Sequence, residues 1–323
     1  MSGRAKIGQR FDELRAERVD YAIHRQDRTF LPTRERCPLC PTRGGAAATE
    51  VPLPAFQIAV LDNRFPAFEA PHGAAEVVIY TDDHDACLGT LPPQRAEDLV
   101  WVWRHRYLEL GAREDIDYVL IFENRGVEVG VTLHHPHGQI YGYPFLPPVP
   151  ALELAADERL GGCAPCALLR RELEDGRRVV YESDALVTYV PYAARWPYEA
   201  HVTLREHRPS LLDCEPEELR ALAAGLQALA RGYDALFDRP FPYVMVVHQA
   251  PTGEAPAPSA ERGATASTGS QRGHLHVEFY PPLRTARKLK YLAGSEQGAG
   301  TFISDTLPEE SAAALREAIA RAA

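Results

Sequence analysis

The sequence predicts an α+β fold in which one structural unit occurs twice. Stretches with the two-residue alternation of β-strands are interspersed with stretches of helical period, so strands and helices mix along the chain. The order of these stretches starts again after Pro150. Each copy also contains a strand pattern with two histidines spaced two residues apart, His135 and His137 in the first copy and His274 and His276 in the second.

The 323-residue chain is long enough to bury a substantial core as two packed halves, which we place at residues 1–150 and 151–323. A net charge of −10 and a pI near 5.7 argue against a nucleic-acid-binding protein with a broad basic surface. No apolar run approaches the roughly 20 residues of a membrane helix, and the first residues lack the apolar core of a signal peptide. We therefore expect a cytoplasmic protein without a nucleic-acid or membrane partner. In the cytoplasm, its six cysteines are expected as thiols or metal ligands rather than disulfides.

Four strands and one helix are predicted in the first half. The helix follows a proline-rich start and has the apolar spacing of an amphipathic helix. The predicted elements are strands at 57–61, 76–80, 118–122 and 129–145 and a helix at 92–111.

The fourth strand contains the motif His-His-Pro-His-Gly-Gln-Ile at residues 134–140. Side chains alternate along a strand, which puts His135, His137 and Gln139 on one face. A neutral imidazole is a good metal ligand and also a good nucleophile. We therefore interpret this face as a functional site rather than as an edge strand with surface histidines.

The second half repeats this order with one insertion. Residues 251–273 are rich in Ala, Gly, Ser, Thr and Pro and lack periodicity, so we expect a mobile loop there. The predicted elements are strands at 179–181, 185–189, 201–205, 243–248 and 274–278 and helices at 216–233 and 308–323.

A Cys-x-x-Cys pair in a proline- and glycine-rich turn can supply two thiolates to one tetrahedral zinc ion. Cys37 and Cys40 form such a pair in the first half, and His84 and His135 complete a Cys2His2 set. A zinc ion with four protein ligands has no open position, so the predicted site is structural and braces the strand next to His137.

The same offsets in the second half select Cys163, Cys166, His207 and His274 as a second zinc site. The two halves then differ two residues after the second histidine of this strand, where the second half has Glu278 and the first half has Gln139. A carboxylate donates no hydrogen bond unless it is protonated. We therefore expect that only the first half carries chemistry.

Three motifs on these strands are Phe122-Glu-Asn-Arg-Gly126, His135-Pro-His-Gly-Gln139 and Phe279-Tyr-Pro-Pro-Leu283. Together they resemble the galactose-1-phosphate uridylyltransferase family of the histidine-triad superfamily, and the resemblance covers nearly the whole chain. It implies a duplicated histidine-triad unit with antiparallel sheets and packed helices. It also implies that His137 attacks UDP-glucose, releases glucose 1-phosphate, and carries the uridylyl group until galactose 1-phosphate accepts it as UDP-galactose.

The Gln139 amide is expected to donate to a phosphoryl oxygen. The resemblance implies that an uncharged donor at this position favours transfer over hydrolysis, because hydrolytic relatives commonly have a histidine there. The resemblance also assigns binding roles to residues that the bare sequence would leave in solvated loops. It implies that Arg25 and Arg28 contact phosphates. It implies that Asn63 and Asn124 contact nucleotide and phosphate. The segment with Lys288 and Tyr291 is implied to reach the neighbouring subunit's hexose-phosphate pocket in a homodimer.

Some members of the family hold a second metal with one glutamate and three histidines. Glu153, His248 and His276 match three of these ligands, but Glu278 stands at the fourth position. The resemblance therefore leaves this set in doubt, and we prefer the set that contains Cys163 as the second metal site.

Two other functions stay open at this point. One is a nucleotide-sugar or dinucleotide phosphorylase or adenylyltransferase of the same superfamily, which would use an adenylyl donor. The other is a zinc-stabilised nucleotide-binding module without turnover. The sequence leaves open the preferred hexose 1-phosphate and nucleotide, and also the role of the 251–273 loop.

Overall fold

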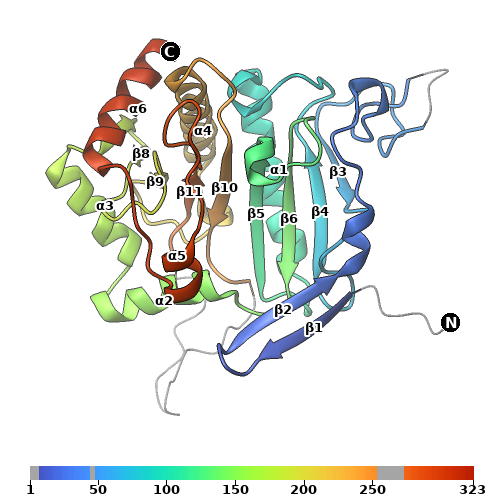
Figure 1. The fold of residues 1–323 in the computed structure, drawn as a ribbon, viewed down its shortest axis with the longest axis horizontal. Helices are drawn as coiled ribbons and strands as arrows, with labels where there is room; N and C mark the ends of the chain where they lie inside the picture. Colours follow the sequence, from blue (N-terminus) through green and yellow to red (C-terminus); the bar gives the residue numbers. More distant parts are fainter. Residues whose placement is uncertain (1–6, 44–47, 253–272) are drawn as a thin grey trace.

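The chain folds around one large antiparallel sheet, which confirms the predicted α+β class (Figure 1). The computed structural model describes residues 7–43, 48–252 and 273–323, so residues 253–272 of the predicted mobile loop lie outside the described part. The strands are β1 (Ile7–Asp12), β2 (Glu17–Ala22), β3 (Ala59–Asp62), β4 (Ala74–Ile79), β5 (Tyr118–Arg125), β6 (His137–Tyr143), β7 (Val179–Glu182), β8 (Leu186–Tyr189), β9 (Ala200–Leu204), β10 (Tyr243–His248) and β11 (His276–Tyr280). Nine of these form the sheet in the order β3-β4-β6-β5-β10-β11-β9-β8-β7, and β1 and β2 form a separate hairpin.

The large sheet consists of two half-sheets with the same strand order. Outward from the centre, the first half runs β5-β6-β4-β3 and the second runs β10-β11-β9-β8, with β7 added at the edge. At the centre β5 pairs antiparallel with β10, where Phe122 lies opposite Val246. The predicted duplication therefore appears as a repeated strand order, and main-chain hydrogen bonds join the halves into one continuous sheet.

Two long helices cover one face of this sheet (Figure 1). α1 (Pro93–Gly111) packs on β5 and β6, α4 (Pro216–Leu236) packs on β8 and β9, and the two helices contact each other. Each begins with a proline in the first turn, where a backbone N–H has no partner in the helix anyway. Their buried side chains, Trp103 and Tyr233 among them, belong to one core that spans both halves. Both helices lie where the sequence predicts them.

The remaining α-helices are α2 (Pro148–Leu160), α3 (Ala164–Asp175), α5 (Gly294–Ala299) and α6 (Pro308–Ala322). α6, the predicted terminal helix, packs against α4. Within the described residues, no helix combines the length and the apolar character needed to cross a bilayer.

The β1–β2 hairpin lies across one end of the sheet and was not predicted (Figure 1). Most of its side chains are exposed, including Phe11 and Tyr21, so neither face of the hairpin shows the apolar alternation of a half-buried strand. It leads directly into a 3-10 helix, Ile23–Asp27, that carries Arg25.

The central histidine-rich strand begins later than predicted, at His137 rather than at Val129. Gly126 and Gly130 adopt the positive φ angles of 96° and 82° that favour glycine, and they enclose a 3-10 turn over 127–129. The β-branched residues before His135 therefore lie in an irregular segment, and strict alternation of side chains starts only at His137.

β5 extends three residues further than predicted, and its extension carries the buried carboxyl group of Glu123. This side chain is 4% exposed, accepts a hydrogen bond from the Tyr243 hydroxyl at 3.2 Å, and lies near the Tyr80 hydroxyl. Burial raises the pKa of Glu123 to about 7, although Arg125 and the two hydroxyls favour the charged form. The folded protein therefore binds a proton here that the unfolded chain releases near pH 4.5.

The difference in stability between the Glu123→Gln variant and the wild type is expected to change in favour of the variant as the pH rises. A carboxyl group whose pKa is higher in the folded than in the unfolded state stabilises the fold fully at pH values below its unfolded pKa. This contribution is lost as the pH rises to the folded pKa, here from about 4.5 to about 7. Urea unfolding at pH 5.5 and pH 8 should show that the variant gains about 2 kcal/mol on the wild type over this range. An equal difference between the two proteins at both pH values would contradict the assignment.

Candidate functional site

The His137 ring is held in one orientation by its own backbone. Its Nδ1 lies 2.7 Å from the carbonyl oxygen of His135, so Nδ1 carries the proton and donates it to this oxygen. Burial lowers the pKa of His137, with the His135 carbonyl acting in the opposite direction, so the ring is neutral at pH 7. Nε2 therefore keeps its lone pair, as a nucleophile requires.

The Gln139 amide is oriented by a chain of hydrogen bonds. Asn63 accepts a bond from the Phe65 N–H at 2.9 Å through its Oδ1, which leaves its Nδ2 to donate to Gln139 Oε1 at 3.2 Å. The Tyr141 hydroxyl donates to the same oxygen at 3.2 Å. Because Oε1 accepts both bonds, the amide nitrogen of Gln139 is directed elsewhere as a donor.

Arg25 reaches this network through Tyr141, whose hydroxyl accepts a hydrogen bond from Arg25 Nη1 at 3.2 Å. Arg25 and Arg28 are half-buried, so they do not belong to the solvated loop that the bare sequence suggests. Arg28 lines the same pocket as His137 and Gln139.

His137 lies between two pockets. One is lined by Arg28, Asn63 and Gln139, and the other by Asn124 and Arg125. Four of the predicted site residues thus line the pockets beside the His137 ring, and these are Arg28, Asn63, Asn124 and Gln139. A fifth, Arg25, is connected to Gln139 through Tyr141.

Lys288 and Tyr291 do not join this group within one chain. Both side chains are exposed, and neither lines the two pockets beside His137. Their predicted role in a neighbouring subunit's pocket stays a prediction.

The first Cys/His set converges beside the active-site segment. The ligand atoms of Cys37, Cys40, His84 and His135 all lie within 4.8 Å of one another. Cys40 Sγ lies 3.4 Å from His84 Nδ1 and 3.5 Å from His135 Nδ1. Zinc bonds of roughly 2.0 to 2.3 Å place the ligands of a tetrahedron about 3.5 Å apart, so this spacing fits zinc.

Hydrogen bonding orients the ligands of this set, and burial shifts the pKa values of two of them. The His135 Nε2–H donates to the Thr81 carbonyl at 2.7 Å, which turns the Nδ1 lone pair toward Cys40. Burial lowers the pKa of His135 to about 4, which keeps its ring neutral. Burial and the neighbouring Cys37 raise the pKa of Cys40 to about 12, a cost that a bound metal ion would reverse.

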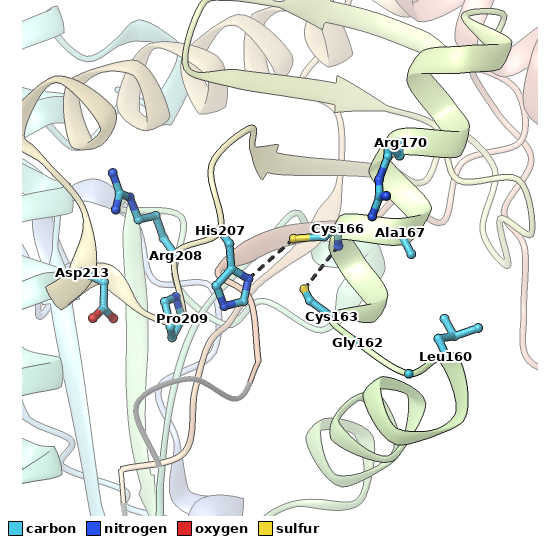
Figure 2. A pocket seen from close by; sticks show the side chains of 11 residues that line it. Leu160, Gly162, Cys163, Cys166, Ala167, Arg170, His207, Arg208, Pro209 and Asp213 are labelled. Carbon is cyan, nitrogen blue, oxygen red and sulfur yellow. Dashed lines mark hydrogen bonds between the residues drawn. The ribbon is translucent and has the colours of Figure 1, made fainter. Parts of the chain in front are cut away.

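The second Cys/His set also converges at the start of α3, and Figure 2 shows three of its members, Cys163, Cys166 and His207. Cys163 is the N-cap of α3, and Cys166 lies in its first turn. The Cys166 sulfur lies 3.5 Å from His207 Nδ1 and 3.1 Å from His274 Nδ1, and all four ligand atoms fall within 4.8 Å. These distances resemble those of the first set, although His207 is exposed.

A third set contains Glu153, His248 and His276, whose ligand atoms also lie within 4.8 Å of one another. Glu153 hydrogen-bonds His248 Nδ1 at 3.1 Å, and Glu278 lies 3.5 Å from His276 Nε2. This set shares no residue with the set at Cys163, so the positions of the two sets do not force a choice between them.

Tyr141 was missed by sequence reasoning, although it hydrogen-bonds both Gln139 and Arg25. A signal was present, because Tyr141 follows Gln139 by two residues and therefore lies on the same face of β6. The bidentate ion pair of Arg125 with Asp234, at 2.7 and 2.9 Å, was also missed, since its partners are 109 residues apart. It connects the end of β5 to α4 beside the pocket.

Comparisons with known proteins cover nearly all of the chain. Residues 57–147 match the family model described as galactose-1-phosphate uridyl transferase, N-terminal domain, and residues 165–322 match the model of the C-terminal domain. A galactose-1-phosphate uridylyltransferase of Thermotoga maritima is 36% identical, covering 95% of this chain and 97% of the relative. Another, from Streptomyces lividans, is 35% identical and covers 95% of this chain and 86% of the relative.

Solved structures agree with these matches. A structure described as a uridylyltransferase superposes with a TM-score of 0.81 at 30% identity and covers 97% of this chain and 98% of its own. An ADP-glucose phosphorylase of Arabidopsis thaliana with bound ADP-glucose has a TM-score of 0.71, covering 96% of this chain and 99% of its own. At 22% identity, this second likeness shows the fold alone.

Replacing Cys37 with Ser should remove about one zinc ion per chain and lower stability by more than about 2 kcal/mol, because metal affinity for the folded state adds to folding free energy. Metal analysis and urea unfolding measure the two effects. Cys87→Ser, at a cysteine outside the metal sets, is the matched control and should keep both properties. Unchanged zinc in the Cys37 variant would remove the first site from consideration.

Proposed function

The chain belongs to the galactose-1-phosphate uridylyltransferase family, and we propose that it transfers the uridylyl group from UDP-glucose to galactose 1-phosphate through a covalent uridylyl-histidine at His137. The observation that carries the proposal is the 2.7 Å hydrogen bond from His137 Nδ1 to the His135 carbonyl. This bond leaves Nε2 as the only ring nitrogen with a lone pair, in a ring that lies between two pockets.

In the first step, His137 Nε2 attacks the α-phosphorus of UDP-glucose. The new P–N bond forms as the P–O bond to the departing glucose 1-phosphate breaks, and the leaving group takes that electron pair. The imidazole gains positive charge, which the His135 carbonyl stabilises through the Nδ1–H. A phosphate oxygen of galactose 1-phosphate then attacks the same phosphorus, the P–N bond breaks, and neutral His137 is regenerated.

Gln139 and the arginines stabilise charge on the transferred group. The oriented amide nitrogen of Gln139 donates to a non-bridging phosphoryl oxygen, where negative charge increases in the transition state. Arg28 binds the diphosphate from within the pocket, and Arg25 holds Tyr141 against Gln139. Asn63 and Asn124 complete the contacts to nucleotide and phosphate on either side of the ring.

The first two Cys/His sets hold structural zinc in this proposal. A bound zinc ion supplies no step of the reaction and instead fixes the segment that contains His135 and its carbonyl. The Cys2His2 composition and the ligand spacing of both sets support this assignment. The chain divides at about residue 150, a boundary supported by the repeated strand order.

Lys288 and Tyr291 contact the hexose phosphate in the pocket of a second subunit, so the active form in this proposal is a homodimer. Their exposure and their absence from both pockets beside His137 support this arrangement. The proposed location of the dimer is the cytoplasm.

An adenylyl-donor phosphorylase is the second candidate, because the resemblance to the superfamily leaves it open and the shared fold does not distinguish the two activities. Incubation with UDP-glucose or with ADP-glucose separates the two functions, since only the true donor leaves its nucleotide on the protein. Labelling by the adenylyl donor alone would replace the uridylyl proposal.

Substituting His137 by Ala should abolish exchange and prevent covalent labelling, because no nucleophile is left between the two pockets. Intact-protein mass after exposure to UDP-glucose should show one added uridylyl group on the wild type and none on the variant. His105→Ala, at an exposed histidine of α1, is the matched control and should label as the wild type does. Labelling of the His137 variant would assign the nucleophile elsewhere.

Mixing two inactive variants tests the shared pocket. His137→Ala and Lys288→Ala homodimers should both be impaired, whereas a heterodimer of the two variants contains one intact site out of two. Half of the dimers in a random mixture are heterodimers, so mixing should restore about a quarter of wild-type activity. Activity is measured after the subunits are allowed to exchange. A mixture no more active than its components would place Lys288 outside the partner's site.

A further inference from the structure

The two Cys/His sets have the same composition but differ in their surroundings. Cys37 is 2% exposed and packs with Leu39, Val51 and Ile79 in a small apolar cluster, with Cys40 packed against it. The Cys37 thiol is therefore shielded from small polar solutes, although Cys40 is half-buried, and a Cys37–Cys40 disulfide cannot form without the buried partner.

In the second set, by contrast, the thiols face an open pocket. Cys163, Cys166 and His207 line it together, and Figure 2 shows their side chains between Arg170 of α3 and Arg208. Both cysteines are only half-buried, and His207 is exposed. Of the four ligands of this set, only His274 is buried, with 2% of its surface exposed.

The two sulfurs are also placed to react with each other. Cys163 Sγ and Cys166 Sγ both approach His274 Nδ1, at 3.5 and 3.1 Å, and Cys163 Sγ accepts a hydrogen bond from the Cys166 N–H at 3.3 Å. The Cys-x-x-Cys spacing at a helix N-terminus is one in which a disulfide forms readily.

We propose that the Cys163–Cys166–His207–His274 set is a redox-labile zinc site, from which a small hydroperoxide releases the metal while the set at Cys37 keeps its own. The inference rests on the zinc binding proposed above for both sets. A thiolate attacks one peroxide oxygen to give a sulfenic acid, and the second thiolate displaces its oxygen as water. Two thiolates thus lose two electrons to form one disulfide, hydrogen peroxide gains two electrons and two protons to form two waters, and zinc leaves because its sulfur ligands are gone.

Release of this zinc frees the start of α3 from the two sheet segments that carry His207 and His274, which stay joined to each other by the pairing of β9 with β11 and by the hydrogen bond from the Leu275 N–H to the Arg208 carbonyl at 2.6 Å. The set connects the start of α3, the segment after β9 that carries His207, and His274, two residues before β11. Among the described residues, the two cysteines of this set belong to no apolar cluster like the one around Cys37, so the metal itself connects the start of α3 to the two histidines.

The test uses zinc-loaded full-length protein, hydrogen peroxide and a chromogenic zinc chelator. Of two bound equivalents, one should be released about tenfold faster than the other, since reactivity follows thiolate exposure. Peptide mass spectrometry should find the Cys163–Cys166 disulfide, and a thiol reductant with added zinc should reverse the change.

Two variants assign the released ion. Cys163→Ser should lack the fast phase, and Cys37→Ser should keep it. If Cys37→Ser does not fold, His207→Ala provides the second variant, because this exposed ligand can be removed without opening the core, and it should weaken only the fast-releasing zinc.

Equal release rates for both ions, a fast phase that survives Cys163→Ser, or release without the disulfide would overturn the proposal, as would binding of a single zinc ion that Cys163→Ser leaves unchanged. Uridylyl labelling of the untreated protein is measured separately. Its failure would count against the transferase function and leave the zinc result standing.

Discussion

The site depends on one short hydrogen bond within the chain, from His137 Nδ1 to the carbonyl of His135. That carbonyl belongs to a residue whose ring is held on both sides, by Cys40 and by the Thr81 carbonyl. Immobilising the His135 ring therefore fixes the acceptor that orients the nucleophile. Under the proposed function, this connection explains why the proposed metal ligand His135 and the proposed nucleophile His137 stand two residues apart.

The second half contains the same hydrogen bond in a different electrostatic setting. His276 Nδ1 lies 2.7 Å from the His274 carbonyl, as His137 does from His135. However, Glu278 and Glu153 surround His276 with carboxylates, whereas the equivalent strand of the first half carries a neutral amide. Negative charge repels a diphosphate and attracts a cation. One backbone geometry thus suits nucleophilic attack in one half and metal binding in the other.

The continuous sheet joins the two halves into one structural unit. β5 of the first half pairs with β10 of the second, and the Arg125–Asp234 ion pair ties the end of β5 to α4. Asn124 lies on this same end of β5, in the pocket beside His137. The second half therefore supports the strand that lines the pocket beside His137, which gives it a structural role in addition to the metal binding proposed for it.

The sequence by itself determined the fold class, the duplication, the two long helices and the membership of both Cys/His sets, because these follow from periodicity and from spacing that repeats between the halves. Only the tertiary structure decided that the β1–β2 hairpin forms and that the strand starts at His137. It also brought Arg25, Tyr141 and Gln139 into one hydrogen-bond chain. The contact of Arg25 with Tyr141 joins residues 116 positions apart and depends on how the whole sheet closes, so no local pattern records it, whereas the hairpin is local but lacks the apolar alternation of a half-buried strand.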